Sequence, residues 1–118
     1  AAPLVWMLLP CVLFGLAHFD PGSAGASAAV VATAAGLFGL LAADLTRRTG
    51  SIGAAWGMHF ANNCFAILGI SVQGTIPGLS LLTTQIAISD TDVIAPLLLQ
   101  DMVLTLLLYA AVRWAVAR

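Results

Sequence analysis

A histidine and two asparagines interrupt an apolar stretch of the chain, in the sequence Gly57-Met58-His59-Phe60-Ala61-Asn62-Asn63-Cys64-Phe65. At helical spacing His59 and Asn63 lie one turn apart on the same face, and Asn62 lies beside them. Imidazole and carboxamide groups are costly in hydrocarbon unless they find partners, so such a cluster at membrane depth predicts a functional site. The alternative is that this polar face only forms hydrogen bonds with neighbouring helices.

A second histidine, His18, ends an earlier apolar run and follows Phe14 in an F-x-x-x-H pattern. The two side chains share a helix face. A lone histidine near a helix end is more often a satisfied side chain than a catalytic group. The F-x-x-x-H pattern is more specific evidence for a functional site when it is paired with the H-x-x-x-N pattern of His59 and Asn63, which follows one helical hairpin later.

Asp101 lies in the middle of another apolar segment, Leu97–Leu104. A carboxylate at this depth costs roughly 2.5–3.5 kcal/mol on insertion scales, so it should face other helices and have a partner. We expect it to accept a hydrogen bond from Asn63, Asn62 or His59 and to support the polar face. The alternative is a protonated Asp101 that bonds to a backbone carbonyl or to a hydroxyl elsewhere.

The composition defines the class of protein that must hold these residues. The chain is 61% hydrophobic and 8% charged, with a mean hydropathy of +1.05, which indicates an integral membrane protein in contact with a lipid bilayer. It has five aspartates and four arginines but no glutamate and no lysine, so nothing suggests a nucleic-acid partner. Cys11 and Cys64 lie in apolar segments and are expected to be reduced.

The apolar segments predict an all-α, polytopic transmembrane helix bundle that forms a single domain over residues 1–118. Small residues at four-residue spacing between Ala28 and Ala43 should let the second helix approach its neighbours closely. Within the linker, the apolar stretch Ser80–Ile88 suggests a short interfacial or re-entrant helix. About four spans are expected, over residues 3–19, 23–49, 52–72 and 93–117, with a linker at 73–92.

The arginines predict the orientation of these spans. Four alternating helices place Arg47, Arg48, Arg113 and Arg118 on the same side of the membrane, which should be the cytoplasmic side. The turn between the second and third helices and the C-terminus would then be cytoplasmic. We expect the membrane to be the bacterial inner membrane.

The F-x-x-x-H and H-x-x-x-N motifs, with the connecting sequence from Gly36 to Ile52, resemble the CPBP family of CAAX prenyl proteases and bacteriocin-processing proteins, also called the Abi family. The resemblance covers residues 12–66 and implies the C-terminal part of the CPBP fold. It implies an intramembrane endopeptidase that hydrolyses peptide bonds with an activated water. The substrate would be a peptide or protein, with or without a prenyl group.

The resemblance also implies a role for each site residue. His18 would position the water, with Phe14 packing against its ring, and His59 and Asn63 would stabilise the oxyanion, with Asn62 in support. The family is commonly called a metalloprotease, although a role for metal is unsettled. Carried over to this chain, His18 and His59 are the candidate ligands of a divalent metal such as zinc.

The chain departs from the family pattern because the upstream Glu-Glu-x-x-x-Arg motif is absent. We expect the chain to be a piece of a longer protein and to be inactive alone. Depth adds a second difficulty: at about 1.5 Å per residue, His59 lies about 12 Å from the arginine side, whereas His18 lies towards the other side. Helix tilt or a kink at Pro10 would have to bring them together.

Two other functions fit parts of the sequence. A non-catalytic bacteriocin-immunity or scaffold protein of the same fold would explain the missing glutamate. A transporter or proton-relay fragment could use His18, His59 and Asp101. It would need a continuous polar path across all four helices, whereas a protease needs a one-sided cavity.

Overall fold

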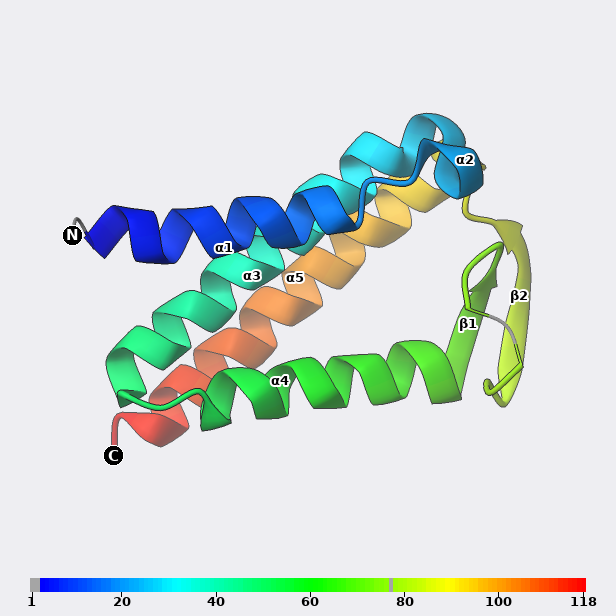
Figure 1. Ribbon diagram of the computed structural model, residues 1–118. Coiled ribbons are helices and arrows are strands. Elements are labelled where there is room, and N and C mark those ends of the chain that lie inside the picture. The colour runs from blue at the N-terminus through cyan, green and yellow to red at the C-terminus, as the bar shows by residue number, and fades with distance from the viewer. Residues whose placement is uncertain (1–2, 77) are drawn as a thin grey trace.

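Four longer helices carry most of the chain in the computed structural model, which describes residues 3–76 and 78–118 (Figure 1). Ala1, Ala2 and Pro77, the last in the expected linker, lie outside the described residues. In Figure 1, α1 and α4 run from left to right, whereas α3 and α5 run side by side from upper right to lower left. The directions therefore alternate along the chain, as expected. The helices are α1 (Pro3–Ala17), α3 (Ala28–Thr49), α4 (Gly53–Asn63) and α5 (Thr91–Val116).

Polar and glycine residues set the ends of these helices. Asp20 caps the short helix α2 (Pro21–Ala24), which leads through the 3₁₀ turn η1 (Gly25–Ser27) into α3. Gly50 ends α3 in the left-handed conformation with φ 65°, and its N–H donates to the Thr46 carbonyl at 2.9 Å. The Ser51 hydroxyl then accepts from the Gly53 N–H at 3.1 Å, so the connection to α4 is short.

Helix α3 is the central helix, because it packs against α1, α4 and α5. Against α1 the approach is close: a Cβ atom on Gly15 would lie 2.8 Å from the Ala32 carbonyl oxygen and 3.3 Å from the Gly36 Cα. The small residues predicted to mediate helix packing therefore do so. Against α4, Leu45 is fully buried with Ala55 and Met58.

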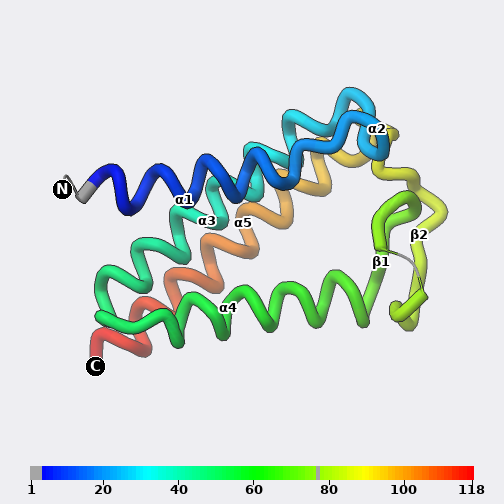
Figure 2. Tube along the Cα trace, in the orientation of Figure 1, coloured from blue at the N-terminus to red at the C-terminus, as the bar shows by residue number. Residues whose placement is uncertain are grey.

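Two hydrogen bonds show that α3 and α5 lie parallel and in register. The hydroxyl groups of Ser27 and Thr91 lie 3.0 Å apart where the two helices begin. The Tyr109 hydroxyl donates to the Asp44 carboxylate at 2.5 Å near their other ends. The trace in Figure 2 follows the same course.

The segment after α4 differs from the expected helix over 52–72. The α-helix ends at Asn63 and continues as the π-helix η2 (Cys64–Gly69), and β1 (Ile70–Gln73) follows. Strand β1 pairs in parallel with β2 (Leu82–Ala87), where a short helix was expected. The β-branched residues of these segments favour strands, and hydropathy alone does not separate a short strand from a helix. The fold is therefore mostly helical with a small sheet, rather than all-α.

Two helices are long and apolar enough to cross a membrane: Pro21–Thr49, which combines α2, η1 and α3, and Thr91–Val116. Helix α1 contributes a shorter apolar helix, Leu4–Ala17. Many large apolar side chains on α1 and α5 face outwards, as they do in helices that contact lipid.

Candidate functional site

All six residues that the sequence singled out line one cavity of about 350 Å³, here called the site cavity. Its wall is built from α1, α3, α4, η2, the loop after β1, and α5. The polar part of the lining is contributed by His18, His59, Asn62, Asn63, Asp101 and Thr105. The apolar part is contributed by Phe14, Val31, Ala34, Ala35, Phe38, Ile67, Ile76, Leu98 and Met102.

His18 lies just beyond the end of α1, and its orientation follows from one hydrogen bond. The Nδ1 atom lies 2.8 Å from the Phe14 carbonyl oxygen. Because a carbonyl only accepts, Nδ1 must carry the proton, which leaves the Nε2 lone pair of the neutral ring free to accept a hydrogen bond. The Phe14 ring supports this orientation, with its centroid 4.5 Å from that of His18.

His59 is half-buried in α4 between two aromatic rings. The Phe14 ring lies edge-on to it at a centroid distance of 5.7 Å, and the Phe38 ring does so at 5.6 Å. Phe14 therefore contacts both histidines, and the imidazoles can be no farther apart than the sum of its two centroid distances. The His59 ring forms no hydrogen bond with any described residue, so its ring nitrogens are available to a ligand in the cavity.

Asn62 and Asn63 are the last two residues of α4, where both are half-buried. Their carboxamides line the site cavity together with His59. The π-helix begins directly after Asn63. Such segments are rare and are often found at functional sites, so this change of helix geometry fits a site at the end of α4.

The close packing of α1 against α3 brings His18 and His59 to one cavity, although the sequence placed them at different depths. Gly15 contacts the backbone of α3 at Ala32 and Gly36, and the neighbouring Phe14 is thereby placed against Phe38 and His59. Helix α1 also crosses α3 at an angle (Figure 1). The end of α1 therefore reaches the same cavity as the middle of α4.

Asp101 lines the site cavity from α5, but the expected hydrogen bond is not formed. Among the described residues, neither His59, Asn62 nor Asn63 donates to its carboxylate, which is exposed. Asp101 therefore faces the asparagines across the cavity without holding them in place. One turn further along α5, Thr105 is 94% buried and lines the same wall, which sequence patterns did not indicate.

The described residues bring together two candidate metal ligands, His18 and His59, in the site cavity. A catalytic zinc site uses three protein ligands and an open position. The described residues contain no group of three histidine, cysteine, aspartate or glutamate side chains that could hold an ion. His18 and His59 therefore supply two of the three protein ligands that a catalytic zinc needs.

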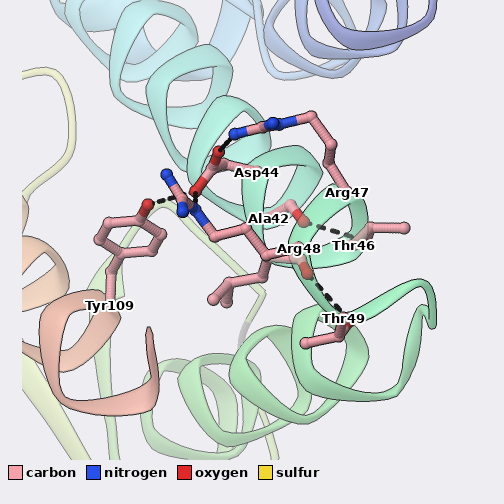
Figure 3. Close-up of polar contacts among 8 residues, drawn as sticks. Ala42, Asp44, Thr46, Arg47, Arg48, Thr49 and Tyr109 are labelled. Atoms are coloured by element: carbon pink, nitrogen blue, oxygen red, sulfur yellow. Dashed lines mark hydrogen bonds and ion pairs between the residues drawn. The ribbon is translucent and has the colours of Figure 1, made fainter. Parts of the chain in front are cut away.

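Two further contacts were missed in the sequence. Phe38 is the aromatic residue of α3, and its contact with His59 could have been inferred from its place in an otherwise small-residue helix. The second missed contact joins Tyr109 of α5 to Asp44 of α3 (Figure 3). The two residues lie at similar distances from the ends of these parallel helices, which is the signal that the sequence offered. Asp44 also accepts hydrogen bonds from Arg47 Nη2 at 2.8 Å and Arg48 Nε at 2.5 Å.

A larger apolar groove of about 620 Å³ adjoins the site cavity. The two share Phe14, Phe38 and His59 in their linings. The groove extends between α1, α3 and α4 from these rings to Arg47 and Ile52 near the end of α3. A ligand with an apolar part and a polar part could therefore occupy both spaces at once.

The family comparison agrees with this arrangement. A family model described as type II CAAX prenyl endopeptidase, Rce1-like, matches residues 1–65, which include Phe14, His18, His59 and Asn63. No curated protein and no solved structure matches the chain. The match covers more than half of the chain and confirms the expected family. The chain therefore belongs to the Rce1-like family of type II CAAX prenyl endopeptidases, which are membrane-embedded proteases.

Proposed function

We propose that this chain supplies the histidine and asparagine groups of an intramembrane endopeptidase site of the CAAX-protease type. The observation that carries the proposal is the site cavity, where His18, His59 and Asn63 from two different helices line one space. Membership of a protease family makes peptide hydrolysis the reaction that these groups would serve.

His59 and Asn63 are suited to stabilise the oxyanion that forms when water attacks a peptide carbonyl. A neutral imidazole N–H and a carboxamide N–H both donate hydrogen bonds without placing a permanent charge in an apolar cavity. Preorganised donors of this kind usually give the largest single contribution to acyl-transfer catalysis. Phe14 and Phe38 restrict the His59 ring, so that its donor is held in place before the substrate binds.

His18 is suited to orient the attacking water. Its Nε2 lone pair can accept a hydrogen bond from water, because Nδ1 donates to the Phe14 carbonyl. General-base catalysis also needs a group that takes the water proton, and the resemblance assigns this to a glutamate that the sequence lacks. Asp101 follows both histidine motifs in the sequence, whereas the family's glutamate motif precedes them. We therefore do not assign Asp101 the role of general base.

The apolar groove suggests how the substrate would bind. Apart from Thr46 and Arg47 at its far end, its lining is apolar up to His59, so it suits the prenyl group or an apolar side chain of a peptide substrate while the scissile bond enters the site cavity. In a bilayer, the groove would open beside the arginines at the ends of α3 and α5. We place this end in the cytoplasm of a bacterial cell.

The test is a chimera in which a segment that carries Glu-Glu-x-x-x-Arg, from an active type II CAAX prenyl endopeptidase, precedes Ala1. The substrate is a farnesylated CAAX peptide, and the readout is kcat/KM. His59→Ala and Asn63→Ala should each lower kcat/KM by about 10²–10³-fold, the effect of losing one oxyanion donor. His18→Ala should lower it by about 10²–10⁴-fold.

Phe60→Ala is the matched control, because Phe60 is exposed and does not line the site cavity. It should leave kcat/KM unchanged. Full activity of His59→Ala in an active chimera would contradict the assignment. A folded chimera that binds the peptide but does not hydrolyse it would instead support the non-catalytic alternative, which the missing glutamate favours.

A further inference from the structure

The positive charges of the chain gather at one end of the helix bundle, here called the arginine end. Arg47 and Arg48 lie in the last turn of α3, Arg113 lies in the last turn of α5, and Arg118 lies just beyond that helix. Figures 1 and 2 show α3 and α5 ending next to each other. Every cationic side chain of the sequence is therefore at this end.

Negative groups offset only part of this charge. Asp44 is the aspartate at the arginine end, and its carboxylate is fully engaged by Arg47, Arg48 and Tyr109 (Figure 3). The C-terminal ends of α3 and α5 each contribute roughly half a negative charge. The side-chain carboxylate of Asp44, the terminal carboxylate after Arg118 and the two helix ends together still leave the four arginines with an excess of positive charge.

A cavity of about 310 Å³ lies within this cluster, lined by Arg48, Arg113, Val116 and Ala117. Arg48 uses its Nε atom for Asp44, and its guanidinium also lies near the Tyr109 hydroxyl, so only part of its donors remains available. Arg113 forms no ion pair or hydrogen bond with any described residue. Two arginines with donors still available therefore line one small space that also has an apolar wall.

We propose that this cavity binds the phosphate of an anionic phospholipid headgroup. Guanidinium groups bind phosphate with paired hydrogen bonds, and two of them can enclose a single phosphate. Val116 lines the cavity and is itself exposed, and Trp114 is exposed two residues before it, so both offer an apolar surface to the attached acyl chains. The Arg118 guanidinium lies 3.6 Å above the Trp114 ring, a pairing suited to the membrane interface.

The fluorescence of Trp114 can report binding, because this residue lies next to Arg113. Trp6→Phe and Trp56→Phe leave Trp114 as the sole tryptophan of the chain. The chain is reconstituted into phosphatidylcholine vesicles that contain a fixed fraction of brominated phosphatidylglycerol or brominated phosphatidylcholine. Brominated phosphatidylglycerol should quench Trp114 several-fold more effectively than the same fraction of brominated phosphatidylcholine.

Arg113→Gln should reduce the preference for phosphatidylglycerol about five-fold, the effect of one arginine near an anionic surface. Arg48→Gln should act similarly, and Arg113→Lys should retain much of the preference because it keeps the charge. Arg47→Gln is the matched control, since it removes the same charge at the same end but lies outside the cavity. Its effect should be clearly smaller.

Three outcomes would overturn the proposal. Equal quenching by the two lipids would show that no anionic headgroup is preferred, and this comparison needs no arginine variant. An equal loss in Arg47→Gln and Arg113→Gln, with unchanged helical circular dichroism, would show that only the diffuse charge matters. Loss of the preference in millimolar inorganic phosphate would show that the cavity takes free phosphate rather than a lipid.

Discussion

The Phe14 ring lies edge-on to the His59 ring at a centroid distance of 5.7 Å, although the two residues belong to different helices. The same Phe14 also contacts His18 and supplies the carbonyl that fixes its tautomer. One apolar residue thus positions both imidazoles of the site cavity. The helix packing that places Phe14 there depends on its neighbour Gly15.

Phe14→Leu should loosen both histidines while it keeps the apolar character of the site. A misplacement of about 1 Å can cost roughly 10²-fold in rate, so we expect kcat of the chimera to fall about 10–100-fold. KM should change less, because the larger part of the apolar groove remains. Phe19→Leu is the control, since Phe19 is exposed beyond α1 and lines neither space. An unchanged kcat in Phe14→Leu would show that the histidines are held by other contacts.

Gly15→Ala should destabilise the fold, because the new Cβ would lie 2.8 Å from the Ala32 carbonyl oxygen. Overpacking of this kind costs about 1–3 kcal/mol, since α1 and α3 must move apart. Gly57→Ala is a matched control in α4, where a Cβ would meet nothing within 4 Å. It should be neutral or stabilising by up to about 1 kcal/mol. Thermal unfolding in detergent micelles, followed by circular dichroism, measures both, and equal stability of the two variants would contradict the packing argument.

The sequence predicted the parts of this protein that depend on local pattern. The polar faces of His18, His59 and Asn63 and the small-residue packing of α3 follow from helical periodicity, which is fixed by backbone geometry. The strands at Ile70 and Leu82 were missed, because short apolar segments have no distinctive period. The partner of Asp101 was mispredicted because depth along a helix does not fix which way a side chain turns.

Tyr109→Phe should weaken the contact between α3 and α5. The lost hydrogen bond joins a phenol to a carboxylate that is only 16% exposed, so the cost should be about 1.5–3 kcal/mol. Arg47→Gln breaks another bond to the same carboxylate, but its side chain is 54% exposed, and we expect a loss of only about 0–1 kcal/mol. Unfolding in a denaturing detergent gives both values. A larger loss of unfolding free energy in Arg47→Gln than in Tyr109→Phe would contradict the inference that the Tyr109 hydrogen bond is the stronger of the two.

Asp101→Asn should leave the fold unchanged, because the exposed carboxylate has no hydrogen-bond partner among the described residues. A carboxylate at membrane depth is costly and Asn carries no charge, so the change should not destabilise the fold. Gln100→Ala, the neighbouring exposed residue outside the site cavity, is the control. A clear loss of stability in Asp101→Asn alone would indicate a partner for this carboxylate in the membrane.

Asp20 should make the stability of the turn before α3 depend on pH. Hydrogen bonds from Ser23 and from the Gly22 N–H lower the pKa of Asp20 below its ordinary value, since they favour the charged carboxylate. A carboxyl group whose pKa is lower in the folded state stabilises the fold above its unfolded pKa of about 3.9. This contribution is lost as the pH falls through the folded pKa. Asp20→Asn keeps a good N-cap residue but cannot titrate, so its midpoint temperature should change less than that of the wild-type chain between pH 6 and pH 3. The same pH dependence in both proteins would show that Asp20 does not contribute.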